Sequence, residues 1–195
     1  MIKINNQFFK KPLLVFALEA EAEKQFEGFD KIFVGVGKIN ATFALLKGIE
    51  NYQPDLIINL GTAGSTKFKR AEVVCCSQFI QRDMDATALG FEKFATPFSA
   101  EKTVLNAGIA LENFSIGICG SGDQFEMEHK NPEYNVIDME AYALAFVSAR
   151  EKIPFLCLKY ISDGADGNAV QDWTHEVKKA AQKLKAALQD FESNS

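Results

Sequence analysis

The sequence predicts an α/β fold in which a sheet is covered by helices on both faces. Short apolar runs rich in β-branched residues recur along the chain, and several are continuous rather than alternating, which is typical of strands buried on both faces. Stretches with helical periodicity lie between these runs, so strand and helix alternate. The chain has 195 residues and is 47% hydrophobic. This size and composition suffice for one core, and we expect residues 1–195 to form a single domain.

The expected strands occupy residues 13–18, 31–36, 55–60, 72–80, 114–119 and 155–161. The expected helices occupy residues 39–52, about 100–111, 138–150 and 174 to about 191. The last helix places apolar side chains three and four positions apart, with lysines on its other faces, so we expect it to cover the core as an amphipathic helix. Its apolar positions are Trp173, Val177, Ala180, Leu184, Ala187 and Phe191. Residues 193–195 are expected to fray.

Composition and charge exclude several classes of protein. The net charge is -5, the pI is near 5.2 and the 21 Lys and Arg are scattered, so nucleic acid is not an expected partner. The early apolar run at 13–18 is too short for a membrane span or a secretory signal, so we expect a cytoplasmic protein without membrane contact. The cysteines at 75, 76, 119 and 157 lie in apolar runs without metal-binding spacing, and we expect reduced core thiols and no metal site.

Polar and glycine residues follow the ends of the expected strands. The first strand leads to Glu19 and Glu21, later strands to 61–65 (GTAGS) and 120–123 (GSGD), and the last to Ser162 and Asp163. Ligands of α/β sheets bind beyond the carboxyl ends of strands, where glycines let the backbone approach a ligand. Glu140, which enters an apolar helix turn, is a third acid in a similar setting, so we expect one shared crevice.

Other interpretations of these residues remain open. Glu21 could be a surface acid, Asp138 could cap the helix that follows it, and Asp163 could cap a helix or pair with Lys159. The segments 35–40 (GVGKIN) and 61–65 lack the complete dinucleotide and P-loop fingerprints, so neither indicates NAD or ATP. Phe125 follows a glycine loop and could stack on a flat ring.

Five ordered segments, spread over most of the chain, together resemble the nucleoside phosphorylase/nucleosidase superfamily. The nearest branch is similar to 5′-methylthioadenosine/S-adenosylhomocysteine nucleosidase. The segments are 35–41 (GVGKINA), 58–64 (INLGTAG), 121–125 (SGDQF), 138–141 (DMEA) and 161–163 (ISD). The resemblance implies a three-layer fold with a mixed, twisted and partly barrel-like sheet flanked by helices. It also implies a homodimer, a purine nucleoside as the small-molecule partner, and no cofactor.

For the chemistry, the resemblance implies hydrolysis of an N-ribosidic bond. Asp163, aided by Ser162, would protonate N7 of the purine, and Glu21 would orient or activate water. Protonation makes the base a better leaving group, and burial that raises the pKa of a carboxyl suits it to this task.

The resemblance also assigns substrate-binding positions. Glu140 and Met139 would hold the ribose hydroxyls, Phe125 would stack on the base, and Thr62, Ala63 and Gly64 would line the ribose side. We expect Glu140 to be ionised, since its charge would favour the positive charge that develops on the sugar.

The chain departs from the family in two ways. The stretches 22–31 and 90–140 are short, and Glu126 stands where adenine-specific relatives have an apolar residue. These departures leave the base and the 5′ substituent open, and with them a futalosine-type hydrolase and a non-catalytic nucleoside-binding homologue. A phosphate-dependent phosphorylase is a further alternative, although acids at 19, 21 and 23 would repel phosphate.

Overall fold

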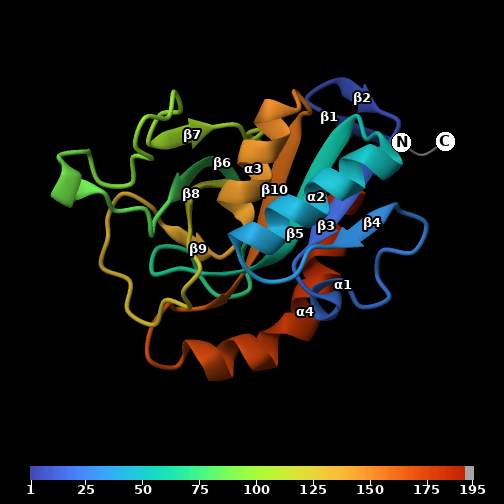
Figure 1. Cartoon of the computed structure of the whole chain (residues 1–195). Helices are drawn as coiled ribbons and strands as arrows, with labels where there is room; N and C mark the ends of the chain where they lie inside the picture. The colour runs from blue at the N-terminus through green and yellow to red at the C-terminus, as the bar shows by residue number, and fades with distance from the viewer. Residues whose placement is uncertain (192–195) are drawn as a thin grey trace.

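A computed structural model describes residues 1–191 of the chain (Figure 1); strands and helices alternate at its two ends, but no α-helix lies between β5 and β9. Its first half contains β1 (Ile2–Ile4), β2 (Gln7–Phe9), β3 (Pro12–Phe16), α1 (Glu19–Ala22), β4 (Lys31–Phe33), α2 (Lys38–Tyr52), β5 (Leu56–Gly64) and β6 (Val73–Gln81). A 3-10 turn at Thr87–Leu89, β7 (Val104–Asn106), β8 (Ser115–Ser121), β9 (Val136–Asp138), α3 (Ala141–Arg150), β10 (Phe155–Asp163) and α4 (Ala169–Gln189) follow.

The main sheet is mixed, and part of it closes on itself. Strand β10 pairs in parallel with β5 and antiparallel with β6; β6 continues through β8 and β9, and β9 returns to β5. These pairings close a five-stranded ring, and β3 and β4 extend the sheet from β5. The predicted α/β class with a mixed, partly barrel-like sheet is confirmed.

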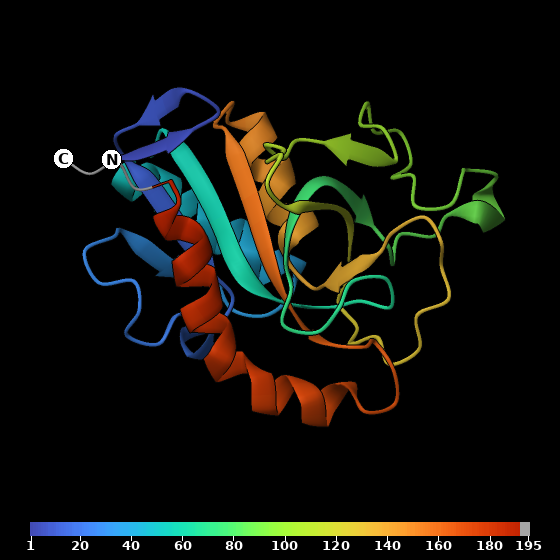
Figure 2. The same ribbon diagram turned by 180° about the vertical axis from the view of Figure 1, so that it is seen from behind.

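Helices cover the sheet on two sides. Helices α2 and α3 pack together on one side, and α4 runs across the other, as the front and rear views show (Figure 1, Figure 2). The apolar strand residues divide accordingly between two cores, because neighbouring positions of a buried strand face opposite layers. For example, Ile57 packs in the core with α2 and α3, and Ile58 packs in the core with Leu184 of α4.

The prediction of a helix at about 100–111 is wrong. Only β7 is regular there, and it pairs antiparallel with β6. The chain then runs directly against β6, where a Cβ on Gly108 would lie 2.5 Å from the carbonyl oxygen of Cys76. Backbone bonds from Gly108 to Ser77 and from Ile109 to Phe155 replace the helical ones, so pairing with the sheet overrides the local apolar spacing.

Element ends differ elsewhere from the expectations. Residues 136–138 form β9, so the helix expected from 138 begins at Ala141, and α4 begins at Ala169 rather than 174 and ends at Gln189. The small β1–β2 hairpin was not expected. The predicted fraying of 193–195 lies outside the described residues, and the single domain over 1–195 stays a prediction.

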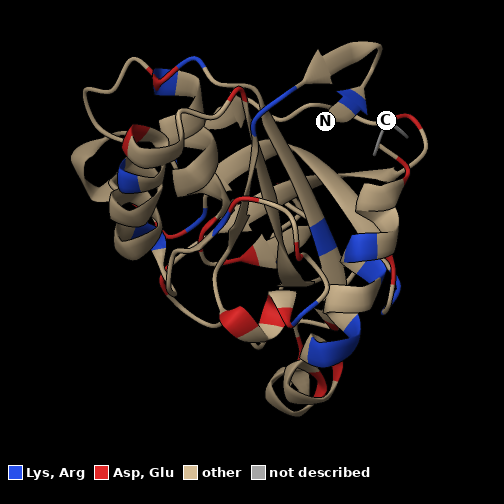
Figure 3. Ribbon diagram, turned by 90° about the vertical axis from the view of Figure 1, so that its right-hand side faces the viewer, with Lys and Arg blue, Asp and Glu red and all other residues tan. Residues whose placement is uncertain are grey.

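The cysteines are free and buried, as predicted for core thiols. Basic and acidic residues are spread over several elements rather than gathered by sign on one face (Figure 3). Within residues 1–191, no helix combines the length and the apolar character that a membrane crossing requires.

Candidate active site

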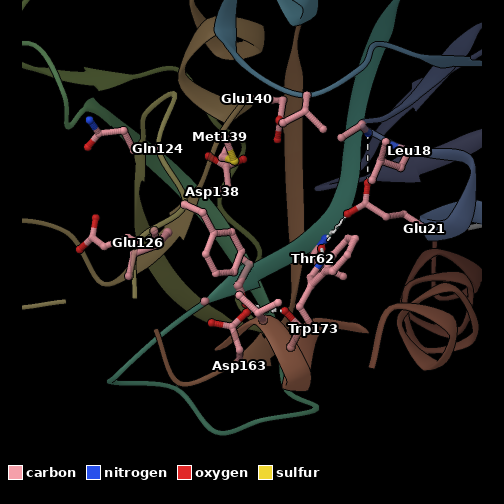
Figure 4. Close-up of a pocket in the computed structure, with 18 of the residues that line it drawn as sticks. Leu18, Glu21, Thr62, Gln124, Glu126, Asp138, Met139, Glu140, Asp163 and Trp173 are labelled. Atoms are coloured by element: carbon pink, nitrogen blue, oxygen red, sulfur yellow. Dashed lines mark hydrogen bonds between the residues drawn. The ribbon is translucent and has the colours of Figure 1, made fainter. Parts of the chain in front are cut away.

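The sheet topology brings the predicted site residues together. Parallel pairing sets Asp163 of β10 opposite Gly64 of β5, and Gly64 also pairs with Ile137 of β9. A cavity of about 310 Å³ lies at these strand ends. Every residue predicted from the sequence lines it: Glu21, Thr62, Ala63, Gly64, Phe125, Met139, Glu140, Ser162 and Asp163. Figure 4 shows Glu140 and Asp163 at opposite ends of this view, with Glu21, Thr62 and Trp173 along one side.

Glu21 is buried rather than a surface acid. The single-turn helix α1 turns it back toward the strand ends, where its carboxylate accepts four hydrogen bonds. Oε2 accepts from the backbone N–H groups of Ala17 at 3.1 Å and Leu18 at 3.2 Å. Oε1 accepts from both the backbone N–H and the hydroxyl of Thr62, each at 2.8 Å. All four partners are donors, an arrangement that suits a carboxylate.

Asp163 ends β10 and is buried. The hydroxyl of Ser162 donates to Oδ2 at 2.8 Å, and the backbone N–H of Ala165 donates to Oδ1 at 2.9 Å. Burial raises the pKa of the Asp163 carboxyl, although these two hydrogen bonds oppose the shift. Gly64 permits this placement, because a Cβ there would lie 2.7 Å from Oδ1 of Asp163. A carboxyl with a raised pKa at the wall of a cavity can hold a proton for transfer.

Glu140 precedes α3 and is also buried. The backbone N–H of Gly37 donates to its Oε1 at 2.8 Å. Burial, and then the negative charge of Asp138, raise the pKa of Glu140 to about 8, while Lys159 and the Gly37 N–H act in the opposite direction. This pKa favours the protonated carboxyl at pH 7, which differs from the ionised state expected for Glu140 from the sequence. It can therefore donate as well as accept a hydrogen bond.

Asp138 and Lys159 form a buried ion pair beside Glu140, with Nζ and Oδ2 2.8 Å apart. Burial opposes the charge on both groups, but their mutual attraction holds the pKa of Asp138 below and that of Lys159 above the ordinary range. Asp138 also accepts from the N–H of Ala141, the first residue of α3, so its side chain bonds the start of this helix although Glu140 occupies the N-cap position. The alternative pair of Lys159 with Asp163 is not formed, because the two residues are four positions apart in one strand, which separates their Cα atoms by about 13 Å.

Sequence reasoning missed two polar groups at the cavity. Trp173 was assigned to the core, but it lines the cavity and its indole N–H donates to the Thr62 hydroxyl at 3.0 Å. The signal in the sequence was the indole N–H of Trp173, because a half-buried indole usually donates to a hydrogen-bond acceptor. Arg82 also lines the cavity and pairs with Glu126 at 3.0 Å.

Phe125 and the two histidines of the chain are placed as follows. Phe125 lies in a loop, lines the cavity and is half-exposed, a setting in which its ring is free to stack on a ligand. His129 pairs with Glu126 at 2.7 Å, and His175 is on the outer side of α4. Among residues 1–191, no three side chains of His, Cys, Asp or Glu are grouped so that they could hold a metal ion.

Comparison with known proteins agrees with this architecture. Residues 31–191 match the phosphorylase superfamily. A 5′-methylthioadenosine/S-adenosylhomocysteine nucleosidase of Marinomonas sp. (strain MWYL1) is 28% identical over 86% of this chain and 82% of its own. The enzyme of the same name from Buchnera aphidicola subsp. Schizaphis graminum (strain Sg) is 30% identical over 78% of this chain and 73% of its own.

A solved structure shows the same fold. It is a mutant 5′-methylthioadenosine/S-adenosylhomocysteine nucleosidase of Helicobacter pylori with 5′-methylthioadenosine in the active site. It superimposes with a TM-score of 0.81 at 19% identity and covers 92% of this chain and 96% of that chain. Fold, site geometry and sequence relationship lead to one assignment. The chain belongs to the phosphorylase superfamily and, within it, to the family of the 5′-methylthioadenosine/S-adenosylhomocysteine nucleosidases.

Proposed function

We propose that this protein hydrolyses the N-ribosidic bond of a purine nucleoside of the methylthioadenosine/adenosylhomocysteine type. The observation that carries the proposal is the meeting of three buried acids from distant parts of the chain, Glu21, Glu140 and Asp163, around one cavity of about 310 Å³. That volume suits a small ligand rather than a polymer. The names of the relatives support the same substrate class.

In the proposed reaction the bond from the base to C1′ of the ribose breaks, and its electron pair stays with the base. Asp163 transfers its proton to N7, which makes the base a neutral leaving group; its raised pKa supports this role. Water adds to C1′ and gives its proton to Glu21. Ser162 holds Asp163 in place through the hydrogen bond to Oδ2.

The other lining residues bind the substrate in this proposal. Glu140 and Met139 hold the ribose hydroxyls, and the protonated carboxyl of Glu140 can donate to one hydroxyl and accept from another. Phe125 stacks on the base. The ribose lies against the strand end formed by Thr62, Ala63 and Gly64.

Water is favoured over phosphate as the nucleophile. Arg82 is the single Lys or Arg among the described lining residues, and it is already paired with Glu126. A phosphate near Glu21 would instead meet a carboxylate, and the described lining residues offer no unpaired Lys or Arg to offset the repulsion.

We also propose that the protein is a cytoplasmic homodimer. Helix α2 exposes three large apolar side chains along one face: Ile39 is 81% exposed, Phe43 67% and Leu46 40%. Their spacing of four and three residues forms a stripe that a second copy can cover.

The test is incubation with methylthioadenosine, adenosylhomocysteine, futalosine and inosine, with and without phosphate, while free base is measured. Release of base without phosphate is expected. Release that requires phosphate would establish a phosphorylase instead, and binding without any release would establish a non-catalytic nucleoside-binding protein.

A further inference from the structure

We propose that Trp173 is a positioning residue for Glu21 and acts through the hydroxyl of Thr62. This inference rests on the proposed function, in which Glu21 receives a proton from water. Three groups form a continuous chain of hydrogen bonds: the indole N–H of Trp173 to Thr62 Oγ1 at 3.0 Å, and Thr62 Oγ1 to Glu21 Oε1 at 2.8 Å (Figure 4). The residues come from α4, β5 and α1, which lie up to 152 positions apart in the chain.

The chemistry of the three groups fixes the direction of this chain. An indole N–H can only donate, so the Thr62 oxygen must accept from Trp173. A hydroxyl has one proton, and the Glu21 carboxylate can only accept, so the Thr62 proton lies on the side of Glu21. Trp173 thereby favours the one orientation of the Thr62 hydroxyl that serves Glu21.

This orientation matters because Glu21 has no other adjustable partner. Four donors approach the Glu21 carboxylate, two on each oxygen, so the attacking water shares an oxygen with them. Three are backbone N–H groups, of Ala17, Leu18 and Thr62, which the strands and α1 hold in place. The fourth is the Thr62 hydroxyl, which can rotate about a single bond. Trp173 therefore controls the one hydrogen bond to Glu21 that can be lost without a change of the backbone.

The ring of Trp173 has a second, separable effect, since it forms part of the cavity wall with Leu18 and Val170. Trp173→Phe distinguishes the two effects, because phenylalanine keeps an aromatic ring and lacks the N–H. If Trp173 positions Glu21, this variant lowers kcat about five- to ten-fold and changes KM less than two-fold. If Trp173 only lines the cavity, KM rises and kcat is kept, which overturns the proposal.

A double-mutant cycle tests whether the effect passes through Thr62. Thr62→Val keeps the backbone N–H bond to Glu21 and removes the hydroxyl. In the Thr62→Val background, Trp173→Phe is expected to lower kcat no further. If the effects of the two substitutions on kcat multiply, Trp173 acts independently of Thr62. That result would refute the proposed relay, meaning the hydrogen-bond chain from Trp173 through Thr62 to Glu21.

A spectroscopic measurement keeps this inference separate from the proposed function. Trp173 is the single tryptophan of the chain, so one indole N–H resonance reports its hydrogen bond in an amide NMR spectrum of the whole protein. We expect Thr62→Val to shift this resonance and to speed its exchange with solvent, and Glu21→Gln to shift it through the intact Thr62. Glu176→Gln, on the same helix and bonded to Tyr160 rather than to the relay, is the matched control and should leave it unchanged.

The outcomes are distinguishable. An indole resonance that ignores both Thr62→Val and Glu21→Gln refutes the relay even if the protein releases base at full rate. A relay visible in the spectrum, in a protein that releases no base from any nucleoside of the panel, refutes the proposed function instead. In that case the hydrogen-bond chain stands as a structural link between α4 and α1.

Discussion

Replacement of Glu140 by glutamine should change how stability depends on pH. The native pKa of Glu140 is about 8 against an ordinary value of 4.5, so between these pH values the native protein binds a proton that the unfolded chain has released. Stability therefore falls as the pH rises through this range, up to the native pKa. The cause is mainly the burial of the carboxyl, with the charge of Asp138 as the second contribution.

The magnitude follows from the shift. One unit corresponds to about 1.4 kcal/mol, and the native carboxyl is half ionised at pH 8, so the wild type loses about 2 kcal/mol of stability between about pH 6 and pH 8. Gln cannot ionise, so the Glu140→Gln variant lacks this loss, while titrating groups remote from Glu140 contribute equally to both proteins. We expect the wild type to lose about 2 to 3 kcal/mol more than the variant between about pH 6 and pH 9.

Urea unfolding of the wild type and the variant at about pH 6 and about pH 9 measures this difference in stability. Equal pH dependence in the wild type and the variant would refute the reasoning, since it would mean that Glu140 ionises normally in the folded protein. A larger loss of stability in the Glu140→Gln variant than in the wild type would also contradict it, because the difference would have the opposite sign.

Two further predictions concern the ion pair and the apolar stripe. Lys159→Met should lower the free energy of unfolding, measured in urea, by about 3 to 5 kcal/mol, because it leaves the charge of Asp138 buried without its partner. Adding Asp138→Asn should recover part of that loss. A Lys159→Met variant as stable as the wild type would show that the pair is unimportant for stability. If the protein is the proposed homodimer, Phe43→Arg should shift it toward monomer in light scattering, whereas Phe98→Arg, at a position 96% exposed and outside α2, should not. A dimer unaffected by Phe43→Arg would place the interface elsewhere.

Much of the architecture could be predicted because the sheet is simple to recognise. Continuous apolar runs marked most of the main-sheet strands, and parallel strands bring residues at their carboxyl ends to one edge. Residues as distant as Glu21 and Asp163 could therefore be assigned to one crevice before any pairing was known. The family resemblance added the expected identity of each contact.

The remaining features depend on contacts that local sequence does not encode. The pairing of Lys159 with Asp138 depends on how β10 and β9 are each placed against β5, and the bond from Trp173 to Thr62 joins positions 111 residues apart. The segment at 100–111 has helical spacing but is held by the edge of β6. The raised pKa of Glu140 arises from the enclosure of the finished cavity.

The central claim is that Asp163 supplies the proton that releases the base in this cavity. The most direct test is Asp163→Asn, in which the amide is isosteric with the carboxyl but cannot transfer its proton to the base. Base release from methylthioadenosine should fall about 10²- to 10⁴-fold, while calorimetry shows the unreacted nucleoside still bound with near wild-type affinity. Release at the wild-type rate would contradict the account.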